Sequence, residues 1–251
     1  MAKVEWKVEG PVRTVVMNRP EKRNALDGEM MEELKAAFKV PPKPEERVAV
    51  IRGAGPVFCA GLDLAWRARN PQGESGIEHM LHAVETYPLP VVAIVQGDAI
   101  AGGNELALHC DLIVASTKAR FGMSLAQVGL APSWFLAKKL LEAAGPAMTR
   151  QILLLGDPLP AKRFHDLGIV SHLAEPGELE NVASKVVQRL ADNAPLSLEA
   201  MKALINREMK FRDQIPHEDI DVIVDRARMS EDAQEGMRAR LEKRKAVFKK
   251  R

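Results

Sequence analysis

Hydrophobic and polar residues alternate near the start of the chain. Val4, Trp6 and Val8 alternate with polar residues, as in a strand that is buried on one face only. Gly10-Pro11 predicts a turn, and residues 12–17 predict a strand that returns from it. The chain therefore begins with two predicted strands joined by a turn.

Longer apolar runs follow, with helical patterns between them. The runs at residues 48–51 and 91–95 predict strands buried on both faces of a sheet, and residues 111–115 predict another strand. Asp27 is placed to cap a helix, and residues 77–87 predict a second helix. The first of these helices has an apolar face formed by Met30, Met31, Leu34 and Phe38. Strands that alternate with helices predict an α/β fold.

The strand patterns become sparse after about residue 137. From residue 196 onward the sequence is typical of helix almost throughout. We therefore predict an α/β core over residues 1–195 and a helical C-terminal region over residues 196–251.

A glycine-rich turn at residues 97–107 carries the most informative chemistry. It follows the apolar strand at 91–95 and leads into a predicted helix. Gly102 and Gly103 leave backbone N–H groups exposed at the helix start, where the helix dipole favours negative charge. Glu105 lies three residues after Gly102, one turn along the same face. Amides that bind an oxyanion beside a carboxyl group are what enolate chemistry requires.

Composition narrows the class of protein. The 251 residues carry a net charge of only +2, which argues against a protein that binds nucleic acid. Two cysteines are too few for a disulfide framework, and their spacing to histidine predicts no metal site. The first residues carry no apolar signal segment, and no apolar run is long enough to cross a membrane. From this we expect a cytoplasmic protein without a membrane or nucleic-acid partner.

A second glycine-containing loop, at residues 58–64, also follows a predicted strand. Together with the glycine-rich turn it resembles the enoyl-CoA hydratase/isomerase (crotonase) superfamily, and the resemblance spans nearly the whole chain. The segments that carry it are residues 18–26, 58–64, 97–107 and 110–115, Phe121-Gly122, and residues 242–248. These segments are specific for the family and much less specific for the reaction.

The resemblance implies a spiral of ββα turns with a C-terminal helical region that supports assembly into a homotrimer or hexamer. It implies an acyl-CoA substrate of the kind found in fatty-acid metabolism, with no separate cofactor, because coenzyme A enters as part of the substrate. The N–H groups of Leu62 and Gly102 would form an oxyanion hole, and Glu105 would be the acid/base. Lys243 would reach the CoA phosphates. The remaining residues expected along CoA are Lys22, Arg23, Ala25, Ala60, Asp63 and Leu64.

The sequence departs from the family pattern where hydratases usually carry a second glutamate, three residues after the Phe-Gly pair. Here that position is Leu125, which cannot move a proton. Gln127 and Ser133 are polar candidates for holding a water molecule, although such residues are more often surface or cap residues. Trp134 and Phe135 are bulky where small residues are usual, and they either belong to the core or reshape the acyl pocket.

Three functions remain open at this point. The first is hydration of a 2-enoyl-CoA with Glu105 as the acid/base. The second is a reaction that needs one carboxyl group: double-bond isomerisation, decarboxylation or thioester hydrolysis. The third is a non-catalytic protein that binds acyl-CoA, or RNA through the basic residues 238–251. His109, one turn after Glu105, is placed to tune it, although a structural histidine is the commoner case.

Overall fold

The structure, a computed structural model, describes residues 2–70 and 76–250. Its main sheet has the strand order β1-β2-β3-β4-β6-β9. The strands are β1 (Val4–Glu9), β2 (Val12–Met17), β3 (Val48–Gly53), β4 (Val91–Val95), β6 (Leu112–Ser116) and β9 (His172–Ala174). β1 and β2 are antiparallel, and every later strand is added in parallel to the same edge.

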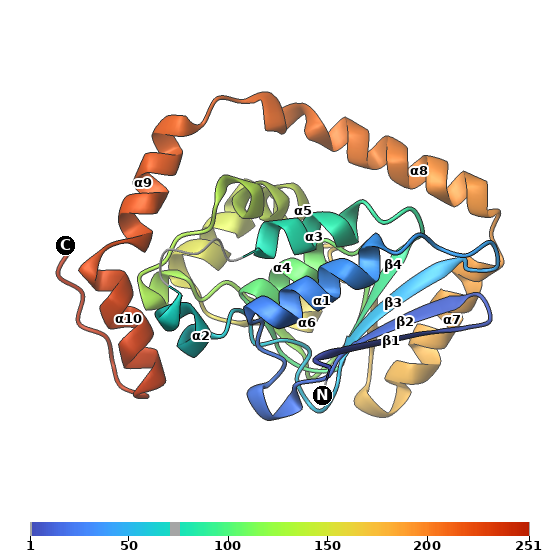
Figure 1. Cartoon of the computed structure of the whole chain (residues 1–251), viewed down its shortest axis with the longest axis horizontal. Coiled ribbons are helices and arrows are strands. Elements are labelled where there is room, and N and C mark those ends of the chain that lie inside the picture. Colours follow the sequence, from blue (N-terminus) through green and yellow to red (C-terminus); the bar gives the residue numbers. More distant parts are fainter. Residues whose placement is uncertain (1, 71–75, 251) are drawn as a thin grey trace.

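Helices cover both faces of this sheet (Figure 1). α1 (Gly28–Lys39), α3 (Ile77–Glu85) and α4 (Gly102–Leu108) pack on one another along one face. α7 (Leu179–Ala191) packs against β3, β6 and β9 on the other. Strands between two helical layers are apolar on both sides, which is why β4 is buried at every position.

A smaller sheet supports the loops at the end of the main sheet. It has the order β5-β7-β8, formed by β5 (Ala99–Ile100), β7 (Arg120–Gly122) and β8 (Leu159–Pro160). The sequence pattern did not predict it, because strands of two or three residues are too short to show a periodicity. Its β5 strand leads directly into the glycine turn before α4.

The remaining helices of the core connect these layers. The longest is α5 (Trp134–Leu155), which is interrupted at Gly145, where φ is 68°, just before Pro146. The others are α2 (Leu64–Arg69), α6 (Ala161–Asp166), and the short 3-10 helices η1 (Pro20–Lys22), η2 (Ala126–Val128) and η3 (Pro176–Glu178).

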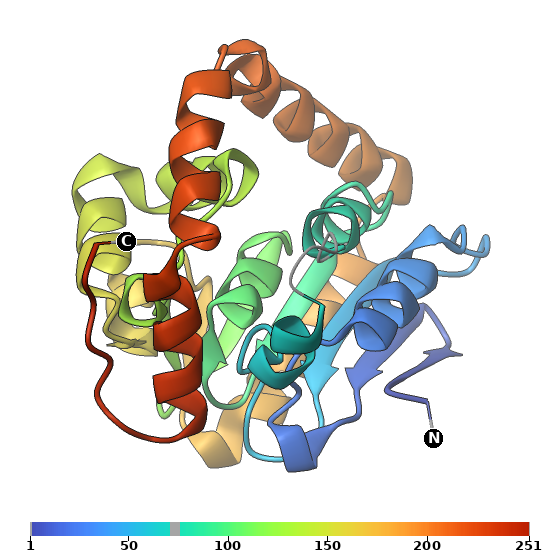
Figure 2. The same cartoon turned by 60° about the vertical axis from the view of Figure 1, so that its left-hand side comes forward.

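The C-terminal region is helical, as expected. It consists of α8 (Pro195–Glu208), the 3-10 helix η4 (Met209–Gln214), α9 (Glu218–Arg228) and α10 (Glu231–Leu241). α8 and α9 run along the outside of the α/β core, and α10 returns to contact α2 and η2 (Figures 1 and 2). None of the described helices is long and apolar enough to cross a membrane.

The α/β class and the order of the main elements are confirmed. Asp27 caps α1 as predicted, because its carboxylate accepts a hydrogen bond of 3.0 Å from the Met30 amide. The division of the chain into two regions between residues 195 and 196 stays a prediction. It coincides with the start of α8 to within one residue.

Candidate active site

The two glycine-containing loops lie side by side and are joined by backbone hydrogen bonds. The Cys59 amide donates to the Asp98 carbonyl at 3.1 Å, and the Ile100 amide donates to the Cys59 carbonyl at 2.9 Å. Cys59 of the first loop and Ala99 of β5 therefore form a parallel β-bridge that joins the two loops. This pairing fixes residues 58–64 relative to the start of α4.

The backbones of Gly61 and Gly102 approach each other closely where the two loops meet. A methyl group on Gly61 would lie 2.7 Å from the Ile100 carbonyl oxygen and 3.2 Å from the Gly102 nitrogen. Gly61 also has φ of 88°, which a side chain rarely allows. The structure thus brings the predicted oxyanion residues, Leu62 and Gly102, to the same place, since Leu62 directly follows Gly61 in the chain.

Ala101 holds the turn into α4 in a strained conformation. Its φ of 48° and ψ of −115° are values that glycine usually supplies. The Ala101 amide donates to the Gly122 carbonyl at 2.7 Å, and the Ala101 carbonyl accepts from the Glu105 amide at 3.0 Å. These bonds on both sides determine the direction of the peptide that carries the Gly102 N–H. This strain could not be predicted from the sequence, because the residue is an alanine.

Glu105 is completely buried on α4, and every residue of this helix is buried with it. Neither of its carboxyl oxygens has a hydrogen-bond partner among the described residues. Burial without a partner disfavours the charged form, so the pKa of Glu105 is raised to about 8, although Lys139 acts in the opposite direction. A buried carboxyl group with unused hydrogen-bonding capacity and a raised pKa is typical of an acid/base residue.

His109 lies one helical turn after Glu105 and is also buried. Its Nδ1 is 2.8 Å from the Glu105 carbonyl oxygen and 4.0 Å from Oε2 of the Glu105 carboxyl group. Burial and the positive charge of Lys139 lower the pKa of His109 to about 4, so the imidazole is neutral at physiological pH. The ring stacks on Phe135 of α5, with centroids 5.1 Å apart.

An ion pair borders this group of buried residues. Lys139 of α5 is 2.6 Å from a carboxylate oxygen of Glu85, the last residue of α3. Burial raises the pKa of Glu85, but the charge and hydrogen bond of Lys139 outweigh this effect and hold it below its usual value. α3, α4 and α5 are thus linked by charged and polar groups beside Glu105.

Most residues predicted along CoA lie together where residues 18–26 meet residues 58–64. The Ala60 amide donates to the Arg23 carbonyl at 3.0 Å, and the Asp63 amide donates to the Leu26 carbonyl at 2.9 Å. Lys22 ends the 3-10 helix η1, and its carbonyl accepts a bond from the Ala25 amide. Leu64 begins α2 at the end of the second loop. The site therefore unites Lys22, Arg23, Ala25, Ala60, Asp63 and Leu64.

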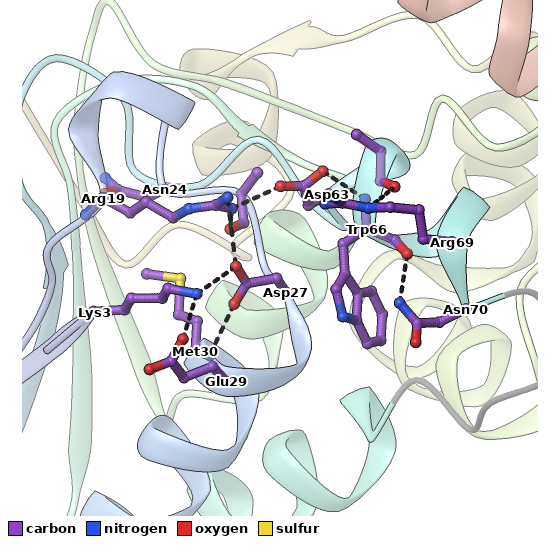
Figure 3. Close-up of polar contacts among 12 residues, drawn as sticks. Lys3, Arg19, Asn24, Asp27, Glu29, Met30, Asp63, Trp66, Arg69 and Asn70 are labelled. Carbon is purple, nitrogen blue, oxygen red and sulfur yellow. Dashed lines mark hydrogen bonds and ion pairs between the residues drawn. The ribbon is translucent and has the colours of Figure 1, made fainter.

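Asp63 has structural partners that the sequence did not reveal. Its carboxylate caps α2 by accepting from the Trp66 amide at 3.0 Å, and it forms an ion pair of 2.8 Å with Arg19 (Figure 3). Arg19 also lies 3.4 Å from Asp27, the cap of α1. The hydrogen bond from the Trp66 amide and the positive charge of Arg19 keep the pKa of Asp63 below its usual value in spite of burial. The Asp63 side chain therefore joins the starts of α1 and α2.

Asn24 is a structural residue of the site that sequence reasoning missed. It is completely buried and has φ of 53°, a conformation that asparagine tolerates better than most residues. Its side-chain amide donates to the carbonyls of Ala54, Val57 and Phe58, and its oxygen accepts from the Arg19 amide at 3.0 Å. Asn24 thus fastens the first loop to the chain that leads into the second. Asn24 stands in the segment 18–26 that carries the family resemblance, but its partners are about 30 residues away along the chain.

Lys243 lies outside this loop cluster along the chain. It follows α10, the helix that contacts α2, and it has φ of 56°. Its amide donates to the Arg240 carbonyl at 3.3 Å. Its predicted contact with CoA phosphates stays a prediction.

The polar residues proposed to replace the missing glutamate have other roles. Ser133 caps α5, and Gln127 donates to the Leu155 carbonyl and to Asp157. Leu125 is partly buried and packs against the hydrophobic core. The structure therefore supplies no second carboxyl group from residue 125, and it places Gln127 and Ser133 in ordinary structural contacts.

The two bulky residues that follow Ser133 both stack on histidine rings. Trp134 stacks on His217 from the C-terminal region, with centroids 4.6 Å apart. Phe135 packs against the core and stacks on His109, as described above. The sequence left open whether these residues are core or pocket, and for Phe135 the structure shows core packing directly beside the candidate acid/base residue.

The site can polarise a carbonyl through backbone amides and move a proton through one buried carboxyl group. The described residues contain no cluster of three His, Cys, Asp or Glu side chains that would hold a metal ion. The family described as Enoyl-CoA hydratase/isomerase matches residues 7–251. The chain belongs to this family.

Individual relatives agree with this membership. A protein named putative enoyl-CoA hydratase from Thermus thermophilus is 37% identical over 205 residues, which cover 78% of this chain and 81% of that protein. Enoyl-CoA hydratase EchA19 from Mycobacterium tuberculosis is 32% identical and covers 96% of this chain and 94% of its own.

Among solved structures, a methylmalonyl-CoA decarboxylase in complex with 2-nitronate-propionyl-CoA has a TM-score of 0.92. It is 25% identical, and the match covers 99% of both chains. The likeness includes the C-terminal region. Hydratases and a decarboxylase of acyl-CoA thioesters are thus both similar to this chain, which supports an acyl-CoA-transforming enzyme of the crotonase fold.

Proposed function

We propose that this member of the enoyl-CoA hydratase/isomerase family hydrates a 2-enoyl-CoA thioester. The observation that carries the proposal is the contact between the Gly61 and Gly102 backbones beside the buried, unpaired carboxyl group of Glu105. Coenzyme A enters as part of the substrate, along residues 22–25 and 60–64, and no separate cofactor takes part.

In this proposal the N–H groups of Leu62 and Gly102 bind the thioester oxygen. Negative charge develops on that oxygen when the α-carbon becomes an enolate, and preorganised donors stabilise it without any movement. Loss of one such donor typically raises the barrier by about 3 kcal/mol. Gly102 has no side chain between its amide and the ligand, and the strained Ala101 peptide keeps the amide pointing in one direction.

Glu105 performs the proton transfers. In its ionised form it accepts a proton from water as the water oxygen bonds to the β-carbon, and the electrons of the double bond move to the thioester as an enolate. The protonated Glu105 then returns the proton to the α-carbon, so that the elements of water have been added and the enzyme is unchanged. One carboxyl group is sufficient for this sequence, which fits the presence of Leu125 in place of a second glutamate.

Decarboxylation of a malonyl-type thioester is the second candidate, and the likeness to methylmalonyl-CoA decarboxylase favours it. Loss of CO₂ leaves the same enolate on the same amides. Here Glu105 must begin protonated, because its first act is to donate a proton to the α-carbon. A buried carboxyl group with a pKa of about 8 is already protonated at pH 7.

The two candidates require opposite pH dependence. The profile of kcat/KM reports groups of the free enzyme. Hydration needs the ionised form of Glu105, so kcat/KM is expected to rise as pH increases through about 8. Decarboxylation needs the protonated form, so kcat/KM is expected to fall over the same range.

The test is turnover of crotonyl-CoA and of methylmalonyl-CoA by the purified protein between pH 6 and 9. Loss of absorbance of the conjugated thioester that disappears in Glu105→Gln supports hydration, while CO₂ release that disappears in the same variant supports decarboxylation. Glu180→Gln is the matched control, because Glu180 is exposed and pairs with Arg52 on the surface. Turnover that is unchanged in Glu105→Gln would overturn the proposed role of Glu105 in either reaction.

We further propose that the enzyme assembles as a homotrimer or a dimer of trimers through the C-terminal region. α8 and α9 expose large apolar side chains, which a second copy would cover. These side chains are Leu196, Met201, Leu204, Ile205, Ile220, Val222 and Ile223. Light scattering of the full chain tests this, and a monomer at micromolar concentration would contradict it.

A further inference from the structure

His109 has an orientation that its contacts define. Its Nδ1 lies 2.8 Å from the Glu105 carbonyl oxygen, which can only accept a hydrogen bond, so Nδ1 carries the hydrogen of the neutral ring. Nε2 then has a free lone pair, and it is buried without a hydrogen-bond partner among the described residues. The positive end of the ring dipole therefore points toward Glu105.

The ring is held in this orientation by packing. His109 is only 2% exposed, and its plane lies at 21° to the ring of Phe135. Stacking on Phe135 keeps the plane of the buried ring, and the hydrogen bond from Nδ1 to the Glu105 carbonyl determines which edge of the ring faces Glu105. The Glu105 carbonyl does not need the imidazole as a donor, because it already accepts the helix hydrogen bond from the His109 amide at 3.0 Å. The Nδ1–H is thus additional to the normal helix bonding.

The same N–H also lies near the Glu105 carboxyl group. Oε2 of Glu105 is 4.0 Å from Nδ1, close enough for an ion–dipole interaction but too far for a hydrogen bond. The other charged groups that face this pair come from α3 and α5. They are Glu85, Lys138 and Lys139. Lys139 is already paired with Glu85, so its charge is shared between two carboxyl groups.

We propose that His109 is a positioning residue for Glu105: its fixed Nδ1–H stabilises the ionised carboxylate and holds one oxygen on the His109 side. The other oxygen then remains available for the substrate. His109 acts as a neutral dipole and neither takes nor gives a proton. This inference rests on the proposed function only for its kinetic test, because the titration of Glu105 can be followed without a substrate.

The first experiment measures the titration of Glu105 directly. The protein is labelled with ¹³C at the glutamate carboxyl carbon, and its signal is assigned by its loss in Glu105→Gln. In His109→Phe, which keeps a stacked ring but has no N–H, the pKa of Glu105 is expected to rise by about one unit. His109→Asn places an amide N–H close to the position of Nδ1 and is expected to restore most of this shift.

His165→Phe provides the matched control. His165 also bonds a carbonyl through Nδ1, at 2.8 Å from the Val170 oxygen, but it lies on α6 outside the site. This variant is expected to leave the titration of Glu105 unchanged. An unchanged pKa of Glu105 in His109→Phe would overturn the inference, as would a shift that is equal in His109→Asn and His109→Phe. If His109→Phe fails to fold, the inference is decided by His109→Asn and the ring ¹⁵N spectrum of the wild type, which must show Nδ1 protonated between pH 6 and 9.

The kinetic readout separates this inference from the proposed function. The pH midpoint of kcat/KM should move upward in His109→Phe by the same amount as the titration, while KM at the optimum stays the same. If Glu105→Gln abolishes turnover but His109→Phe leaves the midpoint in place, the inference fails and the proposed function stands. If Glu105→Gln has no effect on turnover, the proposed function fails, and the titration alone decides the role of His109.

Discussion

Replacement of Glu105 by glutamine should stabilise the protein, and the gain should depend on pH. The carboxyl group is completely buried and unpaired, which raises its pKa to about 8 from the ordinary value of 4.5. Between these two pH values the unfolded chain is ionised at this position while the folded protein keeps its proton. The contribution of the protonated Glu105 to the free energy of unfolding is therefore fully present below pH 4.5. It is lost progressively as pH rises toward 8.

The size of the effect follows from the difference between the two pKa values. Each pH unit in this interval lowers the free energy of unfolding by about 1.4 kcal/mol, so the total loss is about 5 kcal/mol by pH 9. At pH 7 the loss is about 3 kcal/mol. Glutamine has nearly the same shape and does not ionise. The difference in stability between Glu105→Gln and the wild type should therefore grow with this slope from pH 5 to pH 8 and then level off.

Urea unfolding followed by circular dichroism at five pH values between 5 and 9 measures this difference. All samples need one protein concentration, because an oligomer's apparent stability changes with concentration. Other titrating groups cancel in the comparison of the two proteins. Glu180→Gln, an exposed substitution, should change stability by less than about 0.5 kcal/mol at every pH. A difference between Glu105→Gln and wild type that is constant from pH 5 to 9 would refute the reasoning, because the carboxyl group would then be ionised in the folded protein at low cost.

Three further substitutions test other parts of the site. Gly103→Ala places a methyl group 2.2 Å from the Cys59 carbonyl oxygen and should lower thermal stability and turnover together, whereas Gly177→Ala, with open space around it, should change neither. Asn24→Ala leaves three buried carbonyls without a donor and should lower the free energy of unfolding in urea by about 3 kcal/mol; a loss below about 1 kcal/mol would contradict its fastening role. Leu125→Glu should raise crotonyl-CoA hydration, and a rate no higher than wild type would show that a second carboxyl group is not limiting.

The main sheet could be predicted because its strands are encoded locally. The continuous apolar runs at β3 and β4 and the cap at Asp27 depend on neighbouring residues alone. The small sheet formed by β5, β7 and β8 could not be predicted in this way. Its strands are two or three residues long, and they form because the two glycine-containing loops are brought together by the larger fold.

The candidate site was predictable as a set of residues but not as an arrangement. Gly102 and Glu105 belong to one short motif, in which the glycines at the start of the helix are visible in the sequence. The strain at Ala101 and the bonds of Asn24 depend on partners far along the chain, so no local pattern reports them. His109 was visible one turn after Glu105, but only the structure shows that Phe135 fixes its ring.

The central claim is that the paired amides and Glu105 make and protonate the enolate of an acyl-CoA thioester. The most direct measurement is the exchange of the α-protons of butyryl-CoA, a saturated thioester that cannot be hydrated, in D₂O. The account predicts that the wild type incorporates deuterium at the α-carbon and that Glu105→Gln does so at least about a hundredfold more slowly. Bound butyryl-CoA with no exchange in the wild type, or equal exchange in both proteins, would contradict it.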